Sequence, residues 1–145
     1  MPSAEHSVVI RRPREEVFAF LADGENDVRW RPAVLDVRRE RGPGGAGDLY
    51  RQGVKGPFGR RVPADYEVTA LEPGRRRAFR AIAGPVRPEG SYELADAEGG
   101  TRVTFRLTCA PAGLARLMTP MVARSMRSEV ACLENLRRVL ETDAP

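Results

Sequence analysis

The sequence predicts an α+β fold in which a curved antiparallel sheet of seven strands wraps around a long C-terminal helix, with two short helices after the first strand. Two observations predict it. From Val34 to Cys109, extended segments alternate with turns rich in glycine and proline, which is typical of an antiparallel meander. After Pro111 comes the only long helical pattern, whose apolar side needs a dry sheet face to lie on. We expect residues 1–145 to form a single domain.

The chain begins with a strand and two short helices. His6 to Ile10 is predicted to be extended. Pro13 stands where a helix begins, and the acidic and apolar residues after it, up to Leu21, predict a short amphipathic helix. Asp23 and Gly24 end that helix, and Pro32 limits the next stretch to one or two further turns.

Six more strands fit between the turns of the central region. They span about 34–41, 49–55, 60–71, 76–83, 86–95 and 101–109. Because successive side chains point to opposite sheet faces, every second residue shares a face. Apolar residues hold one face of three strands: Val62, Ala64, Tyr66, Val68 and Ala70; Tyr92 and Leu94; and Val103, Phe105, Leu107 and Cys109. One face of the sheet is therefore expected to be dry.

The last predicted element is a helix from about Leu114 to Glu141. At 100° per residue its apolar residues fall on one side, with most arginines on the other. Pro120 lies inside the pattern and predicts a kink, or a break between a short first piece and the main helix.

The composition excludes several classes of protein. The net charge is +4 and the pI about 9.7, but Lys55 is the only lysine, and the arginine clusters at 38–41, 60–61 and 75–77 are not interleaved with stacking aromatics. We expect these clusters to form a solvated face and no nucleic acid to bind. No apolar run reaches the roughly 20 residues of a membrane span, and no secretory signal is visible, so we expect a cytoplasmic protein.

Neither a metal nor a cofactor is expected. The single histidine and the spacing of Cys109 and Cys132 do not fit a metal site, and we expect both cysteines to be reduced apolar fillers. The glycine-rich segment 42–47 lacks the Lys-Ser/Thr ending of a phosphate loop. Any catalysis must therefore use general acid–base chemistry and positioning in a dry pocket.

Several segments resemble one superfamily. The opening Val8-Val9-Ile10-Arg11-Arg12-Pro13-Arg14-Glu15-Glu16-Val17-Phe18 is similar to that of START-like (SRPBCC) proteins, most of all the polyketide cyclase/dehydrase branch. Further similar segments follow in the same order, namely Trp30 with Pro32, Gly47-Asp48, Gly59-Arg60-Arg61, the stretch Tyr66 to Pro73, Gly100 to Phe105 and the tail Leu133 to Glu141. The resemblance covers nearly the whole chain and implies the helix-grip fold, with an internal pocket for a hydrophobic molecule.

The resemblance implies several functions and does not choose among them, since the superfamily includes cyclases, dehydratases, carriers and sequestering proteins. We expect a small hydrophobic ligand (polyketide-like, aromatic or lipid-like), bound by a carrier, sequestering or self-resistance protein of bacterial secondary metabolism. The alternative is a cofactor-independent cyclase or dehydratase that uses the same pocket. Whether the protein is an enzyme, and whether it is a monomer or a homodimer, stays open.

The candidate site residues are polar or bulky side chains on the inward side of their elements. His6, Glu129, Tyr66 and Tyr92 are the candidate catalytic groups, each with a structural alternative: partial exposure for His6, an arginine salt bridge or a solvent-facing rotation for Glu129, and core packing for the tyrosines. The predicted ligand-binding residues are Trp30, Tyr50, Gln52, Tyr66, Phe79, Tyr92, Phe105, Met118, Met121, Val122, Ser125 and Glu129.

Overall fold

The computed structural model describes residues 3–84, 86–109 and 119–142. Its strands are β1 (Ser3–Ile10), β2 (Val34–Arg41), β3 (Leu49–Lys55), β4 (Arg61–Pro63), β5 (Tyr66–Glu72), β6 (Arg76–Ala81), β7 (Glu89–Ala97) and β8 (Gly100–Thr108). Its helices are α1 (Arg14–Ala22), α2 (Thr119–Ala131) and α3 (Leu133–Thr142), with short 3-10 turns η1 (Gly24–Arg29) and η2 (Pro57–Gly59). None of these helices is long and apolar enough to cross a membrane.

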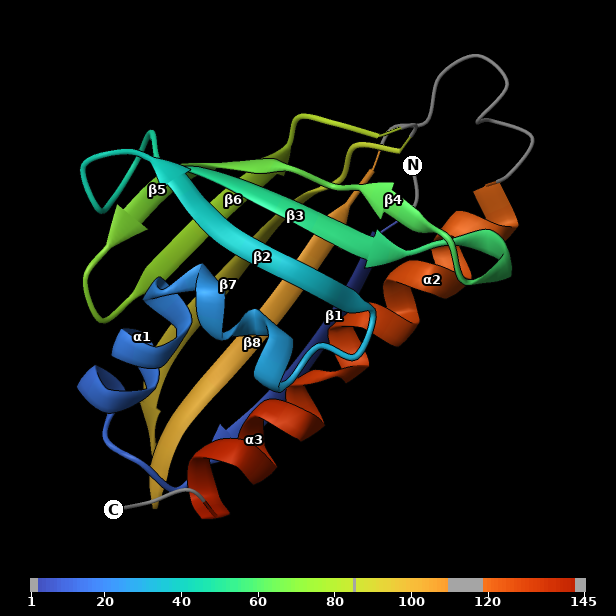
Figure 1. Cartoon of the computed structure of the whole chain (residues 1–145). Helices are drawn as coiled ribbons and strands as arrows, with labels where there is room; N and C mark the ends of the chain where they lie inside the picture. The colour runs from blue at the N-terminus through green and yellow to red at the C-terminus, as the bar shows by residue number, and fades with distance from the viewer. Residues whose placement is uncertain (1–2, 85, 110–118, 143–145) are drawn as a thin grey trace.

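Seven strands form one antiparallel sheet in the order β1-β8-β7-β6-β5-β3-β2, and β4 pairs with β3. The sheet curls so that α2 and α3 lie along its inner side, while α1 and η1 close one end (Figure 1). The first strand is paired over its whole length with the last, from Ser3 opposite Thr108 to Ile10 opposite Thr101. The predicted helix-grip architecture is confirmed.

The expected strand 86–95 spans residues 89–97, and the expected strand 60–71 is divided into β4 and β5. The division comes at Pro63, which has no N–H for the ladder. Ala64 N and Gln52 N are satisfied instead by Gln52 O at 2.8 Å and by the Asp65 carboxylate at 3.1 Å. A register shift between Val68 and Ala70 then changes which residues of β5 face inward. Ala70 pairs with Ala78 on the outer face, and Leu71 packs against the core, so the inward position predicted for Ala70 is wrong.

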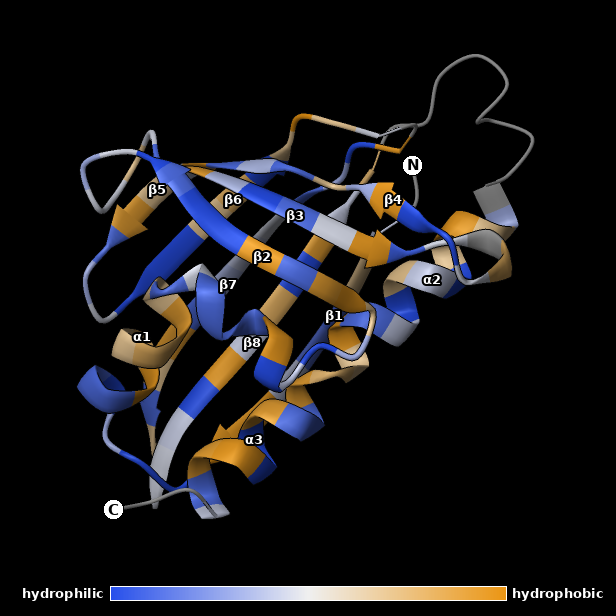
Figure 2. Cartoon of the chain, in the orientation of Figure 1, coloured by the Kyte–Doolittle hydropathy of each residue, from blue (hydrophilic) through white to orange (hydrophobic). Residues whose placement is uncertain are grey.

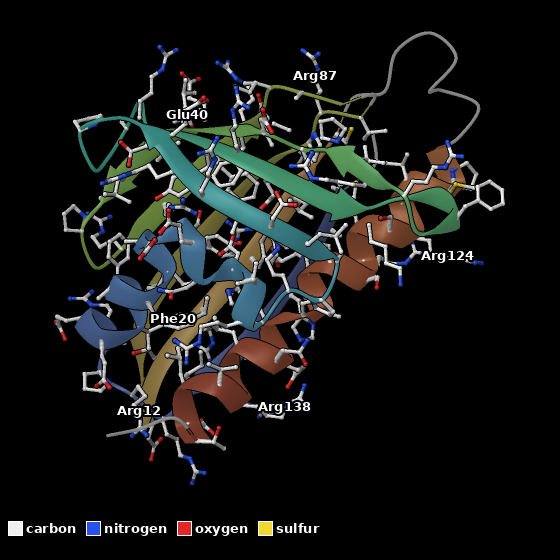
Figure 3. The ribbon with its side chains drawn as sticks, viewed as in Figure 1. Arg12, Phe20, Glu40, Arg87, Arg124 and Arg138 are labelled. Carbon is white, nitrogen blue, oxygen red and sulfur yellow. The ribbon has the colours of Figure 1, made fainter. Side chains whose placement is uncertain are left out.

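The core lies between the inner sheet face, the long helices and α1. The alternation predicted for β7 and β8 is confirmed, since Tyr92, Leu94, Val103, Phe105 and Leu107 are buried. The Trp30 ring meets the rings of Tyr92 and Phe105 edge-on, with centroids 5.9 and 6.2 Å apart. Figure 2 shows hydrophobic residues along one side of α2 and α3 and hydrophilic residues along the other. Arg124 and Arg138 are exposed on these helices (Figure 3).

The predicted long helix is divided at Cys132. Hydrogen bonds from Cys132 N to Glu129 O (3.1 Å) and from Asn135 N to Cys132 O (2.8 Å) close tighter turns than the α-helix does. The Asn135 side chain then donates to Trp30 O at 3.1 Å and fixes α3 to the segment after η1. Pro120 is the second residue of α2, where backbone N–H groups need no helical partner. The predicted piece before it, 114–118, lies outside the described residues.

Candidate functional site

A cavity of about 380 Å³ lies between the inner sheet face and α2. Its walls are mostly apolar side chains of the sheet and of one side of α2. Met121 lines the cavity and is 63% exposed, so the cavity opens to solvent near the start of α2. Glu129, also in the lining, lies about 12 Å farther along α2, at 1.5 Å per residue. The cavity therefore runs from an open apolar end to a buried polar end.

The polar end is built around Arg31. The Arg31 guanidinium donates to the Asp27 carboxylate at 2.9 Å and forms a second ion pair, through Nε, with Glu129. Asp27 lies in η1 and Arg31 follows two residues after its end, whereas Glu129 comes from α2. The side chains of Asp27 and Arg31 are only 2% and 10% exposed. These ion pairs therefore tie η1 to the C-terminal helices inside the protein.

Arg77 of β6 is the second arginine at this end. Its guanidinium donates to the Tyr66 hydroxyl at 3.2 Å and lies 5.4 and 5.5 Å from the ring centroids of Tyr50 and Tyr66, which stack on each other. Gly24 makes this packing possible: a Cβ there would lie 2.1 Å from the Tyr66 hydroxyl oxygen and 3.0 Å from the Arg77 guanidinium. We call Asp27, Arg31, Tyr66, Arg77 and Glu129 the buried polar cluster.

Burial shifts the ionisation of this cluster. It raises the pKa of Asp27 above its ordinary value of 3.8, although Arg31 and Arg77 act in the opposite direction. It also raises the pKa of Tyr66 and Tyr92. Both phenols consequently keep their protons at neutral pH and can donate hydrogen bonds. Burial disfavours the charged form of Arg77, but Tyr66 and Asp27 outweigh it and raise the pKa of Arg77, so the cation is retained.

Most of the predicted ligand-binding residues meet at this cavity. The lining includes Gln52, Tyr66, Phe79, Tyr92, Met121, Val122, Ser125 and Glu129. Three others lie behind its walls: Tyr50 stacks on Tyr66, while Trp30 and Phe105 pack against Tyr92. The predicted contact with Met118 lies outside the described residues.

His6 is not among the residues that line the cavity. Its Nε2 lies 2.9 Å from a Glu134 carboxylate oxygen on α3, and both side chains are partly exposed. Hydrogen bonding to His6 lowers the pKa of Glu134. Glu129 is found in the salt bridge that the sequence left open as an alternative, with Arg31 as its partner. The structure thus places Glu129, Tyr66 and Tyr92 in the cavity lining, and His6 outside that lining, beside Glu134 of α3.

The sequence did not predict four charged residues of the cavity lining: Asp27, Arg31, Lys55 and Arg77. The expectation that the cluster 75–77 is solvated is wrong for Arg77, which is 1% exposed. Arg77 is two residues before Phe79 on the same strand, so both side chains are expected on the same face of the sheet, the inner one. For Asp27 and Arg31, their spacing of four residues was the available signal.

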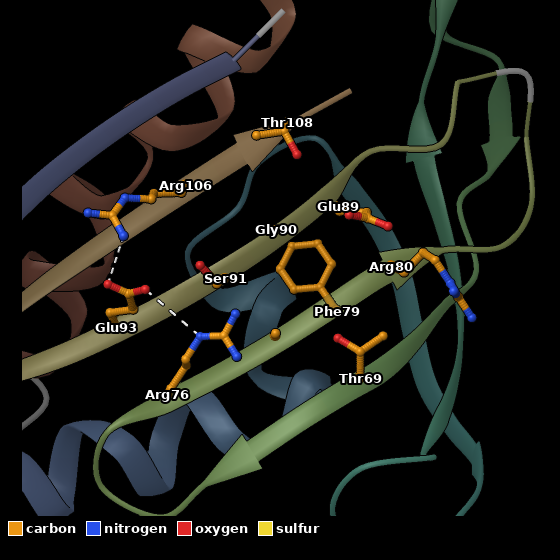
Figure 4. Close-up of a pocket in the computed structure, with 11 residues that line it drawn as sticks. Thr69, Arg76, Phe79, Arg80, Glu89, Gly90, Ser91, Glu93, Arg106 and Thr108 are labelled. Carbon is orange, nitrogen blue, oxygen red and sulfur yellow. Dashed lines mark hydrogen bonds and ion pairs between the residues drawn. The ribbon is translucent and has the colours of Figure 1, made fainter. Parts of the chain in front are cut away.

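A second hollow, of about 410 Å³, lies on the outer face of the sheet. Figure 4 shows it over the small residues Gly90 and Ser91, with Arg76 and Arg106 reaching Glu93 at its rim. Arg76, Glu93 and Arg106 are partly exposed and paired with one another. The inner cavity, with its buried polar cluster, is therefore the better candidate site.

The chain belongs to the family described as polyketide cyclase/dehydrase and lipid transport, whose sequence profile matches residues 1–141. Membership and fold together indicate hydrophobic ligand binding or a cyclase role. No match was found among curated proteins.

Solved structures share the fold at low sequence identity. TTHA0849 from Thermus thermophilus is 21% identical with a TM-score of 0.83, and the similarity covers 99% of this chain and 100% of that one. A START superfamily protein from Mycobacterium smegmatis is 13% identical with a TM-score of 0.82, over 99% and 100% of the two chains. The di-domain ARO/CYC StfQ from the steffimycin biosynthetic pathway is 13% identical with a TM-score of 0.80, over 97% of this chain and 50% of that one.

Proposed function

We propose that this protein binds one small hydrophobic molecule (polyketide-like, aromatic or lipid-like) in the cavity beneath α2, as a carrier, sequestering or self-resistance protein of bacterial secondary metabolism. The observation that supports this most directly is the cavity itself, which joins an open apolar end to a buried polar end. Clefts of this size with a few converging polar groups are typical of small-molecule sites. Apolar contact supplies the affinity, at roughly 25 cal/mol per Å² of surface buried.

The pairing within the buried polar cluster favours binding over chemistry. Glu129 and Asp27 are both ion-paired to Arg31, and Tyr66 is hydrogen-bonded to Arg77. A general base must reach the proton that it removes, whereas these two carboxylates are already paired with the Arg31 guanidinium. Such an arrangement can orient a ligand without transferring a proton.

One observation favours the alternative, a cyclase or dehydratase. Asp27 Oδ1 is buried without a hydrogen-bond partner, and its carboxyl has a raised pKa beside Tyr66 and Arg77. A carboxyl of this kind can exchange a proton with a carbonyl compound whose oxygen is held by a phenol or a guanidinium. In this alternative Asp27, Tyr66, Tyr92 and Glu129 would carry the proton transfers.

A ligand titration separates these functions. The neutral fluorophore N-phenyl-1-naphthylamine should bind the wild-type protein saturably, with one molecule per chain, and raise its melting temperature. Val62→Trp should weaken this binding at least about tenfold, because Val62 lines the cavity on β4 and a bulky ring there occupies the space. Leu35→Trp is the matched control, since Leu35 is 47% exposed and is not part of the lining.

The outcomes differ clearly. If the fluorophore does not bind, or binds Val62→Trp as well as it binds the wild type, the cavity is not the binding site. Incubation with a poly-β-ketone, followed by liquid chromatography and mass spectrometry, then tests the alternative. A compound of unchanged elution time and mass supports a binding protein. Loss of water, or a product of equal mass with a new elution time as ring closure gives, supports an enzyme.

A further inference from the structure

The two arginines of the buried polar cluster differ in how they are paired. Arg31 lies between two carboxylates, those of Asp27 and Glu129. Arg77 has no carboxylate in ion-pairing contact within the part of the chain that the structure describes, and its side-chain hydrogen-bond partner is a neutral phenol, Tyr66. Its Nε is buried without a hydrogen-bond partner. Arg77 is therefore a buried cation with an unused donor.

The surroundings of Arg77 fix its position. The rings of Tyr50 and Tyr66 lie against the guanidinium, and Gly24 packs closely on its end. Arg77 also lines the cavity, together with Tyr66 and Phe79 of the same sheet face. A buried donor that is held in place costs no reorganisation when a ligand arrives, and its hydrogen bond to an oxyanion is about twice as strong as one between neutral groups.

The two carboxylates near Arg77, those of Asp27 and Glu129, do not form an ion pair with it. Asp27 acts on it electrostatically, but the Asp27 carboxylate is paired with Arg31 at 2.9 Å and its pKa is raised by burial. Glu129 is likewise paired with Arg31. Glu129 and one oxygen of Asp27 are thus engaged by the other arginine, and the second Asp27 oxygen, Oδ1, makes no hydrogen bond to Arg77.

We infer that Arg77 anchors a negatively charged oxygen of the ligand, so that the cavity prefers apolar molecules that end in a carboxylate, phenolate or enolate. This inference rests on the proposed function and specifies the chemical class of the ligand. The apolar body lies toward Met121 and Val122, and the acidic oxygen lies at Arg77 beside the Tyr66 hydroxyl.

Two fluorophores with one skeleton test the inference. N-phenyl-1-naphthylamine is neutral, and 8-anilino-1-naphthalenesulfonate adds a single anionic group. Arg77→Met removes the cation but keeps an apolar chain. It should weaken binding of the anionic probe at least about tenfold and change binding of the neutral probe less than about threefold. Arg80→Met is the matched control, because Arg80 is on the same strand but exposed and paired with Glu67, and it should change neither affinity.

The results separate the inference from the proposed function. If neither probe binds the wild type, the proposed function fails. Circular dichroism checks that Arg77→Met is folded. If both probes bind the wild type and the folded variant binds both with equally reduced affinity, or both with unchanged affinity, the role of Arg77 is wrong while the cavity remains the binding site. If Arg77→Met does not fold, the wild type still decides: the Arg77 Nε–H resonance should shift with the anionic probe and not with the neutral one. An unmoved resonance overturns the inference.

Discussion

Arg31→Met should destabilise the protein strongly at neutral pH and much less in mild acid. The substitution removes the shared partner of Asp27 and Glu129 and leaves two carboxylates in the interior, one 2% and the other 19% exposed. Removing one partner from a buried ion pair typically costs about 3–5 kcal/mol, because the remaining charge is desolvated and uncompensated. We expect a loss of about 3–5 kcal/mol in the free energy of unfolding at pH 7.5.

The pH dependence follows from Asp27. Its carboxyl titrates near 3.8 when unfolded and at a higher pH when folded, because burial raises the pKa. The folded state therefore takes up a proton first as the pH falls, and the cost of the buried charge disappears as the pH drops through the folded pKa. Arg31 opposes this shift in the wild type, so its removal raises the Asp27 pKa further. The loss caused by Arg31→Met should consequently shrink between pH 7.5 and pH 5.

Urea unfolding followed by circular dichroism at both pH values measures these losses. Arg80→Met serves as the control, since exposed ion pairs contribute only about 0–1 kcal/mol. A loss below about 1 kcal/mol at pH 7.5, or a loss of equal size at both pH values, would refute the assignment of Arg31 as the shared partner of two buried carboxylates.

Three further substitutions test the packing. Gly24→Ala should lower the free energy of unfolding by about 1–3 kcal/mol, because its Cβ would lie 2.1 Å from the Tyr66 hydroxyl. Gly45→Ala is the control and should be nearly neutral in the same urea titration, since the nearest atom would lie 3.7 Å from its Cβ. Phe105→Ala should cost about 3–5 kcal/mol, since Phe105 is fully buried against Trp30 and Tyr92; a loss as small as that of the exposed Leu35→Ala would contradict this packing. His6→Ala should lower the free energy of unfolding by less than about 1 kcal/mol, because both side chains of its pair with Glu134 are partly exposed. Thermal melts that show a larger loss would assign His6 a structural role.

Strand alternation predicted the inner face wherever the ladder is regular. On β7 and β8 the apolar parity of Tyr92 and Phe105 is also the buried one. The alternation rule failed on β5, because a bulge near Thr69 shifts the register of this strand. The residue types around Thr69 do not indicate a bulge. The break at Cys132 was equally invisible, since neither proline nor glycine marks it.

The apolar part of the candidate site was easier to predict than its charges. Hydrophobic side chains such as Val122 and Phe79 follow the period of their elements, so their side of the cavity could be derived. Arg31 is paired with Asp27, four residues before it, and with Glu129 of α2, and Arg77 is paired with Tyr66 of the neighbouring strand β5. Arginine is a mostly exposed residue type, and these pairings outweigh that preference.

The pairing of β1 with β8 has a consequence for the order in which the protein can assemble during synthesis. Val8 and Ile10 leave the ribosome well before their neighbours on the sheet, Val103 and Thr101, which are made almost a hundred residues later. Until then the edge of β1 has no strand to pair with, and its apolar side chains stay unburied. Contacts this distant in sequence slow folding and leave the nascent chain open to aggregation. The sheet therefore closes only after β8 has emerged, when the first and last strands meet.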